Sequence, residues 1–348
     1  MTAPRILVIS AMRDEGPHLL EWIAHHRALG VSDFLIFSNG CDDGTDVLLD
    51  HLHAAGIVTH VRNEVAPGKT PQWSALKTAA RHPLTQAADW IAVLDCDEFV
   101  HLKPPLSGLP DLIAAVGEAD AIALRWRLFG HDGHARRPQA PTLRAYTRAI
   151  VPDALYPALS GFFKTLYRVA GPFQKPGVHR PRQKPQARPR FVDGSGRALP
   201  DDFVADPGRI LLWDEGQGAD LAALNHYSVR SAEDFLIKAR RGLPNRTAKP
   251  IDLTYWVERN FNMVEETGIQ RHWPATGAEL ARLRALPGVA VAETSSRAWQ
   301  AACFDDLLRD PAMAKLYGRL LLAAGSTAPG AEAARALVAL YRRAAGTG

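Results

Sequence analysis

Short apolar runs alternate with segments of helical periodicity through the first hundred residues. The run from Ile6 to Ser10 predicts a strand, and the segment after it predicts a helix that begins near Pro17 and ends at Gly30. The same alternation continues as far as Asp95. Further strands are expected at DFLIF, IVTHV and WIAVLD, and further helices at about 45–55 and 71–81.

Single helices between successive strands predict parallel pairing with right-handed crossovers, and near-continuous apolar strands predict a sheet covered on both faces. In such sheets ligands bind beyond the carboxyl ends of the strands. Polar clusters follow three of the predicted strands and are therefore expected to meet at that edge. They are residues 13–15, 39–43 and 95–97.

The pattern changes in the middle of the chain. Apolar and polar residues alternate from Asp120 to Gly130, which predicts a half-buried antiparallel strand and hence a mixed sheet. The segment from Gln174 to Arg190 holds six Lys or Arg residues, four Pro and no acid, so it predicts a loop. This loop is either a solvated basic segment or a flap over an anionic ligand.

Amphipathic helices dominate the end of the chain, and Ser231 with Asp234 three residues later predicts the N-terminus of an earlier one. We expect an α/β domain over residues 1–245 and a helical C-terminal region over residues 246–348. The helices expected in that region include 297–308, 312–323 and 331–344.

The composition is that of an ordinary globular protein, with 47% hydrophobic and 22% charged residues in a chain of 348. A net charge of +4 permits an anionic partner but selects none. Three widely separated cysteines form neither a disulfide framework nor a CxxC metal site, which favours a reducing compartment, and a cytoplasmic location is expected. No apolar run approaches the length of a membrane span.

Asp95 and Asp97 stand one residue apart where an apolar strand leaves the core. Two carboxylates on one tight turn are hard oxygen ligands that suit Mg²⁺ or Mn²⁺. A divalent ion there neutralises a diphosphate and helps it to depart as a leaving group. The alternative is that both side chains simply lead the strand into solvent.

Phosphatases of the haloacid-dehalogenase type carry the same Asp-x-Asp spacing after a strand. They usually have Thr or Val two residues after the second aspartate, where this chain has Phe99, and their motif follows the first strand. Here the motif follows the fourth predicted strand. A phosphohydrolase of this type is therefore kept as an alternative function only.

Seven features follow one another between residues 5 and 245: MRDEGPHLLEW, SNGCDDGT, Gln72 at a helix start, ADWIAVLDCDEFV, RWRLFG, GVHRP and NHYSVRSAEDFLIKARRG. Taken together, they resemble GT-A glycosyltransferases of the family 2-like branch, which is related to glycosyltransferase family 92. The resemblance implies a GT-A (Rossmann-like) mixed sheet flanked by helices in a catalytic domain over 1–245. It also implies transfer of a sugar from a nucleotide diphosphate donor, expected to be a UDP-sugar, to a glycan or lipid-linked acceptor.

The resemblance places the nucleoside end of the donor against two segments. One matches the lining of the nucleoside pocket, and the other is SNGCDDGT, in which Ser38 stands where the family often has Asp. The residues matched in this way are Arg13, Asp14, Glu15, Asn39 and Asp43.

The same resemblance assigns Asp95 and Asp97 to a site for Mn²⁺ or Mg²⁺, with His226 as a third metal ligand. Lys238 stands on a helix from which it reaches the diphosphate. The alternative for His226 is a histidine satisfied at a strand end, and for Lys238 a solvated position on the helix.

Enzymes of this branch generally invert the anomeric centre, which requires a carboxylate base to deprotonate the acceptor hydroxyl. Asp214 and Glu215, directly after the strand-like RILLW, are the candidates for that base. The alternative is that both are loop acids without a catalytic role.

Other classes of function leave weaker marks. A complete GxGxxG or GxxxxGK[ST] phosphate loop is absent from the sequence, and the basic segment near 174–190 lacks the interleaved aromatics of a nucleic-acid site, so no nucleic-acid partner is expected. A noncatalytic nucleotide-sugar-binding protein remains an alternative. The basic segment also predicts peripheral contact with an anionic membrane face.

Overall fold

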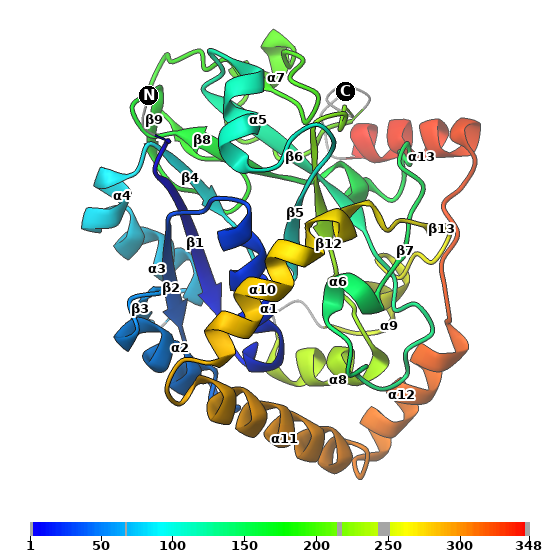
Figure 1. Cartoon of the computed structure of the whole chain (residues 1–348). Coiled ribbons are helices and arrows are strands. Elements are labelled where there is room, and N and C mark those ends of the chain that lie inside the picture. The colour runs from blue at the N-terminus through cyan, green and yellow to red at the C-terminus, as the bar shows by residue number, and fades with distance from the viewer. Residues whose placement is uncertain (1–2, 67, 214–217, 243–250, 345–348) are drawn as a thin grey trace.

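The computed structural model describes residues 3–66, 68–213, 218–242 and 251–344. Within these residues nine strands form one mixed sheet flanked by helices, in the order β3-β2-β1-β4-β8-β6-β12-β5 with β11 paired to β6 (Figure 1). The mixed α/β fold class is therefore confirmed. The strands of this sheet are β1 Ile6–Met12, β2 Asp33–Ser38, β3 Thr59–Arg62, β4 Trp90–Val93, β5 Glu98–Leu102, β6 Ala121–Leu128, β8 Phe163–Arg168, β11 Phe191–Val192 and β12 Ala222–His226.

The first four strands pair in parallel, as the alternation of strands and helices predicts. Strand β8 lies between β4 and β6 and runs antiparallel to both. Strand β6 is thus antiparallel on the side of β8, as expected, but parallel to β12 on its other side. Two short strand pairs lie outside this sheet in the described part of the chain: β9 Phe173–Lys175 with β10 Arg182–Gln183, and β7 Arg148–Ala149 with β13 Val264–Glu265.

Strands β1, β2 and β4 of the parallel half are buried over almost their whole length because most of their side chains are apolar, whereas the edge strand β3 is only partly buried. In β1, Ile6 and Val8 point into the core cluster that contains α1, whereas Leu7 and Ile9 point into the cluster on the other face that contains α3. Four helices that the sequence pattern predicts begin and end close to the expected residues. They are α1 Gly16–Ala28, α2 Thr45–Ala54, α3 Pro71–Ala79 and α8 Ala232–Arg241, and the latter starts with the predicted Ser231 capping box.

The C-terminal helices wrap around this domain. Helix α10 packs on α1, and α11 runs along the base of the molecule in Figure 1, touching α1, α2 and α8. The predicted boundary near residue 245 lies outside the described residues and stays a prediction. The remaining helices are α4 Pro83–Ala87, α5 Leu109–Val116, α6 Thr142–Ala145, α7 Asp201–Ala205, α9 Leu253–Val257, α10 Trp273–Arg284, α11 Val289–Leu307, α12 Pro311–Leu322 and α13 Ala331–Ala344.

The basic segment from Gln174 to Arg190 is partly structural. The buried guanidinium of Arg180 donates hydrogen bonds to the carbonyl oxygens of Phe203, Val204 and Asp206, at the end of α7. A cation that satisfies helix-end carbonyls is committed to the fold. Arg180 is therefore neither a solvated surface charge nor a residue of a freely moving flap.

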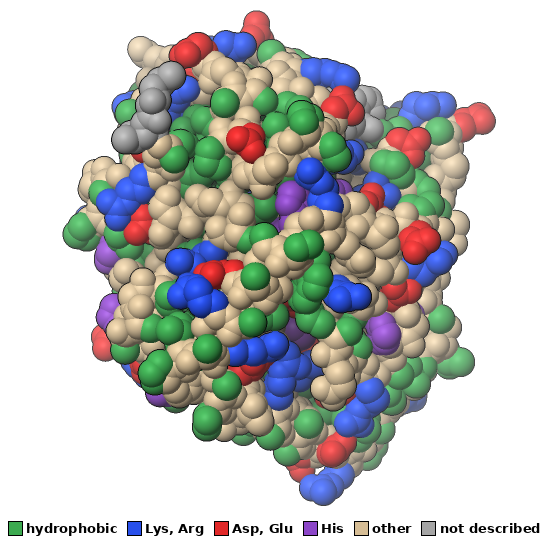
Figure 2. All heavy atoms as spheres, viewed as in Figure 1, with side chains coloured by type: hydrophobic (Ala, Val, Ile, Leu, Met, Phe, Trp, Pro, Cys, Tyr) green, Lys and Arg blue, Asp and Glu red, His purple; other side chains and the backbone are tan. Residues whose placement is uncertain are grey.

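The surface carries charges of both signs. On the face shown in Figure 2, Lys and Arg side chains are interspersed with Asp and Glu, and neither sign covers the face. This pattern agrees with the small net charge of +4. Among the helices of the described residues, none combines the length and the apolar character that a membrane crossing requires.

Candidate functional site

Three loops meet at the carboxyl edge of the parallel strands. The carboxylate of Asp14, after β1, accepts hydrogen bonds from the backbone amides of Asp42 (2.7 Å) and Asp43 (3.3 Å), after β2. Arg230 joins the loop after β1 to the loop after β4, because it pairs with Glu15 at 3.2 Å and donates to the Cys96 carbonyl at 2.9 Å. The predicted convergence of the polar clusters is thus confirmed.

Asp97 is the more enclosed member of the aspartate pair, with 10% of its side chain exposed. Its Oδ2 lies 2.8 Å from Lys238 Nζ, and its Oδ1 lies 3.5 Å from His226 Nε2. Burial disfavours the carboxylate, but the attraction of Lys238 and His226 outweighs it and holds the pKa of Asp97 well below its usual range. Asp97 is therefore ionised at neutral pH and faces two of the residues that the sequence selected.

Asp95 is more open, with 33% of its side chain exposed. Lys164, from β8, lies 2.8 Å from Asp95 Oδ2, and Gln72, at the start of α3, donates to Asp95 Oδ1 at 3.1 Å. Each aspartate of the pair thus has its own lysine. The oxygen that does not face a lysine, Oδ1 in both residues, faces Gln72 at Asp95 and His226 at Asp97.

Glu98 is completely buried beneath the pair and supports its geometry. It accepts hydrogen bonds from the Asp95 amide (2.8 Å) and from Trp126 Nε1 (2.7 Å), and it lies 3.3 Å from Lys164 Nζ. Burial raises the pKa of Glu98 to about 8, against the attraction of Lys164 and with the help of repulsion from Asp95 and Asp97. This carboxyl group orders the turn of the motif from below.

The loop after β1 places its three predicted residues differently. Arg13 has 40% of its side chain exposed, whereas Glu15 is buried between Arg230 and Arg241. Burial opposes ionisation of Glu15, but the two guanidinium groups lower its pKa below the usual value. Asp14 has a left-handed backbone, with φ of 50°, and its Oδ2 has no hydrogen-bond partner among the described residues.

The two predicted residues of the loop after β2 also differ. The Oδ1 atom of Asn39 is buried and unpartnered within the described part of the chain, so it is available to a ligand. Asp43 is fully engaged instead: its Oδ1 accepts from the amide and hydroxyl of Thr45, and its Oδ2 accepts from the Gly16 amide. Asp43 therefore shapes the loop, and its predicted contact with the nucleoside stays a prediction. The predicted bases Asp214 and Glu215 lie outside the described residues.

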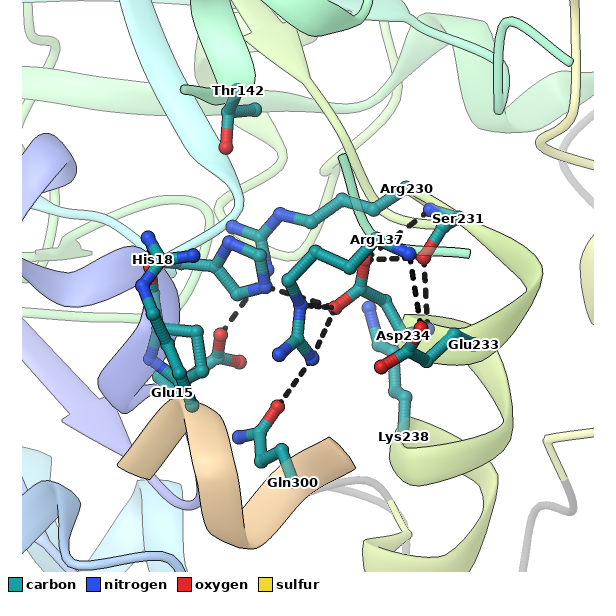
Figure 3. A network of polar contacts seen from close by, with 12 residues as sticks. Glu15, His18, Arg137, Thr142, Arg230, Ser231, Glu233, Asp234, Lys238 and Gln300 are labelled. Carbon is teal, nitrogen blue, oxygen red and sulfur yellow. Dashed lines mark hydrogen bonds and ion pairs between the residues drawn. The ribbon is translucent and has the colours of Figure 1, made fainter. Parts of the chain in front are cut away.

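A small pocket lies between the start of α1 and helix α8, and one of its lining residues is Lys238, the partner of Asp97. Figure 3 shows several of the lining side chains, among them Glu15, Arg230 and Lys238. Cations from α8 and the turn before it line one side, and the loop of Asp14 and Glu15 lines the other. Buried polar atoms normally have partners, so those left without one mark places where a ligand completes the structure. Three of the lining residues carry such atoms within the described chain: Asp14 Oδ2, Ser228 Oγ and Arg230 Nε.

Three residues that make contacts in this site were not predicted from the sequence: Lys164, Arg230 and Gln300. Lys164 carried a signal, because a lysine within the apolar strand FFKTLY is costly to bury unless it is paired. Arg230 lies within the NHYSVRSAEDFLIKARRG motif, but an arginine in a turn is ordinarily a surface residue. Gln300 carried no signal, since a glutamine in an amphipathic helix is also an ordinary surface residue.

The oxygen and nitrogen atoms around Asp95 and Asp97 form an incomplete set of ligands for Mg²⁺ or Mn²⁺. Among the described residues, no three His, Cys, Asp or Glu side chains converge closely enough to hold a metal ion on their own. Mg²⁺ is usually bound by one or two carboxylates together with substrate phosphates. Asp95 and Asp97 fit that incomplete type of site, and His226 as a third ligand stays a prediction.

Comparison with known proteins agrees with the motifs. Residues 12–152 match the model of glycosyltransferase family 92. A glycosyltransferase family 92 protein of Oryza sativa subsp. japonica is 26% identical over 173 residues, which cover 45% of this chain and 28% of that protein. One of Ricinus communis is 28% identical over 156 residues, covering 42% of this chain and 27% of that protein. This chain thus spans about a quarter of the relatives' length, and its resemblance to family 92 glycosyltransferases is confirmed.

Solved structures of low similarity were also found. A crystal structure of S. aureus TarS 1–349 has a TM-score of 0.33 and 11% identity, covering 92% of this chain and 89% of that one. Glucosyl-3-phosphoglycerate synthase from Mycobacterium tuberculosis, in complex with Mn²⁺, UDP and glucosyl-3-phosphoglycerate, has a TM-score of 0.28 and 17% identity, covering 49% of this chain and 60% of that one.

Proposed function

We propose that this chain is a glycosyltransferase that moves a sugar from a nucleotide diphosphate donor, a UDP-sugar, to a hydroxyl group of a glycan or lipid-linked acceptor. The observation that carries the proposal is the pair Asp95 and Asp97 at the carboxyl edge of the sheet, within the region that matches family 92. A pocket with unpartnered buried polar atoms is connected to the pair through Lys238, which lines the pocket and pairs with Asp97.

The charges around the pocket suit a diphosphate. Lys238 and Arg241 line it, and both are held by carboxylates, at Asp97 and Glu15. A lysine or arginine held in position by a carboxylate stabilises an incoming phosphate without having to be ordered first. We propose that Lys238 contacts the diphosphate, with Arg13, Asp14, Glu15 and Asn39 toward the nucleoside.

A divalent ion fits the same place in our proposal, with Mn²⁺ or Mg²⁺ held by Asp95 and Asp97 and, as predicted from sequence, by His226. When bound, such an ion supplies positive charge to the departing diphosphate. Around it, Lys164 keeps Asp95 in place from below, and Glu98 orders the turn that presents both aspartates.

The reaction is proposed to invert the anomeric centre. The acceptor oxygen forms the new bond to the anomeric carbon while the bond from that carbon to the diphosphate oxygen breaks, and the hydroxyl proton passes to a carboxylate base. Asp214 or Glu215 is the proposed base.

We further propose that the protein works in the cytoplasm with peripheral contact to a membrane. Residues 1–245 are the proposed catalytic domain, and residues 246–348 are a proposed helical region.

Ligand-dependent thermal unfolding tests the proposal. Wild type, Asp97→Asn and Asp33→Asn are heated with UDP or GDP, each with and without Mn²⁺. Asp33 is the matched control because it is an ion-paired aspartate far from the candidate site. It lies at the first residue of β2, at the end of the strand opposite to the carboxyl edge, and pairs with Arg5. A ligand at 100 times its Kd stabilises the folded state by about 2.7 kcal/mol, so a nucleotide with Mn²⁺ is expected to raise the Tm of wild type and Asp33→Asn by several degrees.

The comparison uses the shift that the ligand causes in each variant, because Asp97→Asn also leaves Lys238 without its carboxylate. No ligand shift is expected in Asp97→Asn. Release of free sugar from a UDP-sugar distinguishes a transferase from a noncatalytic binding protein, and release of phosphate from simple esters indicates the phosphohydrolase. The absence of any nucleotide shift in wild type would refute the donor site.

A further inference from the structure

Helix α11 turns buried polar side chains toward the loops of the proposed nucleoside pocket. Gln300 is 2% exposed and Ser296 is fully buried, although both lie more than 140 residues beyond the region that matches family 92. Figure 3 shows Gln300 reaching from α11 toward the side chain of Arg137. A buried glutamine needs partners for both ends of its amide.

Gln300 finds these partners in three different segments. Its Nε2 donates to Asp43 Oδ2 at 2.6 Å and to the Asp14 carbonyl at 3.0 Å. Its Oε1 accepts from the guanidinium of Arg137, which in turn pairs with Asp234 at the start of α8. One amide group thereby links the loop after β1, the loop after β2 and the cationic side of the pocket.

The contacts of Asp43 and Asp14 extend this link to the backbone. Asp43 Oδ2 also accepts from Ser296 Oγ at 2.9 Å and from the Gly16 amide at 3.2 Å. The left-handed Asp14 receives the amides of the loop after β2 on its carboxylate. A left-handed aspartate persists where its surroundings hold it, and Gln300 supplies one of the holding contacts.

We propose that Gln300 is a positioning residue of the donor site, and that helix α11 sets the arrangement of the two loops that meet the nucleoside. The inference rests on the proposed function and goes further, because it makes a C-terminal helix part of the nucleotide site. Gln300 touches neither Asp95 nor Asp97, so it acts on donor binding through Asp14 and Asp43.

Removal of the Gln300 amide is expected to weaken nucleotide binding more than it lowers the rate of the chemical step. In Gln300→Leu a buried hydrogen bond to a carboxylate is lost, and the Kd for UDP in the presence of Mn²⁺ is expected to rise about tenfold. The KM for the donor should rise by a similar factor while kcat stays within about threefold, as when binding common to the ground and transition states is removed. Gln300→Glu keeps the size but turns an oxygen toward Asp43, and should weaken binding at least as much.

Glu293→Gln is the matched control on the same helix. Glu293 is buried and pairs with Arg284 of α10 and with Arg297, and these ion pairs involve neither Asp14 nor Asp43. Its loss should lower the Tm and leave the Kd for UDP unchanged. Hydrogen exchange gives a readout that needs no nucleotide: the amides of Gly16, Asp42 and Asp43 should exchange about tenfold faster in Gln300→Leu and at the wild-type rate in Glu293→Gln.

The outcomes separate the two proposals. If wild type binds UDP and Gln300→Leu binds it equally well, with unchanged exchange at the three amides, Gln300 has no positioning role. Equal losses in Gln300→Leu and Glu293→Gln also overturn the inference, because they show a general loss of stability. If wild type binds no nucleotide, the proposed function fails, and with it any role for α11 in donor binding. Should Gln300→Leu not fold, Ser296→Ala removes the neighbouring contact to Asp43 and is expected to give the same pattern about threefold weaker.

Discussion

Lys164 is the buried cation on which the aspartate motif depends most directly. It is fully buried on β8, and its ammonium lies 2.8 Å from Asp95 and 3.3 Å from Glu98. The attraction of both carboxylates outweighs the cost of burial and raises its pKa above the usual value. Lys164→Met keeps the length and apolar stem of the side chain and removes only the charge.

The magnitude follows from the burial of the partners. Removing one partner of a buried ion pair costs about 3–5 kcal/mol because the other charge is left uncompensated. Asp95 is 33% exposed and partly screened by water, whereas Glu98 is fully enclosed. We therefore expect Lys164→Met to lower the free energy of unfolding by about 3 kcal/mol, the lower end of that range.

A double-mutant cycle with Glu98→Gln isolates the pair. Equilibrium unfolding in urea at pH 9, where Glu98 with its pKa of about 8 is ionised, gives the four free energies by tryptophan fluorescence and by circular dichroism. The double variant should be about 2 kcal/mol more stable than the sum of the two single losses, because the glutamine leaves no charge for Lys164 to neutralise. Additive losses, within about 0.5 kcal/mol, would falsify the view that Lys164 serves to neutralise this carboxylate.

Two further predictions concern the stability of the same domain. His26 is buried, its ring is hydrogen-bonded to the Trp22 carbonyl, and burial lowers its pKa to about 4. Between pH 6.5 and pH 4 the unfolded chain therefore takes up a proton at His26 that the folded protein does not. The free energy of unfolding is expected to fall as the pH falls through this range. Unfolding measured at pH 7 and pH 5 should show a loss about 2 kcal/mol larger in wild type than in His26→Gln, and equal losses would contradict the assignment. Gly16→Ala places a Cβ 2.1 Å from Ser296 Oγ and is expected to cost about 1–3 kcal/mol. The variant Gly16→Ala with Ser296→Gly should recover most of the lost Tm, and an unrecovered Tm would point to another cause.

Local patterns were sufficient to predict the parallel half of the sheet and the start of α8. Strand β1 is apolar on both faces and is followed by Pro17 at a helix start, and Ser231 with Asp234 forms a complete capping box. Each of these signals lies within a few residues of the structure that it specifies. The edge at which Asp95 and Asp97 lie follows from the order of strands and helices alone.

The partners of the motif depend on contacts between distant segments. Lys164 reaches Asp95 because β8 pairs between β4 and β6, and Gln300 reaches Asp43 because α11 passes beneath α2. Hydrophobic periodicity specifies which face of a strand is buried, but it does not specify the strand beside it. The residues that surround Asp95 and Asp97 therefore depend on the order of the strands in the sheet, which the local sequence pattern does not specify.

The position of β8 has a consequence for folding. Residues 12–152 form the segment shared with family 92, yet β8 begins at Phe163 and separates β4 from β6 within the sheet. A polypeptide cut to the shared segment would expose the edges of both strands, and unpaired strand edges invite aggregation. The sheet therefore needs residues beyond the matched segment: β8 pairs with both β4 and β6, and β12, which ends at His226, pairs with the other side of β6.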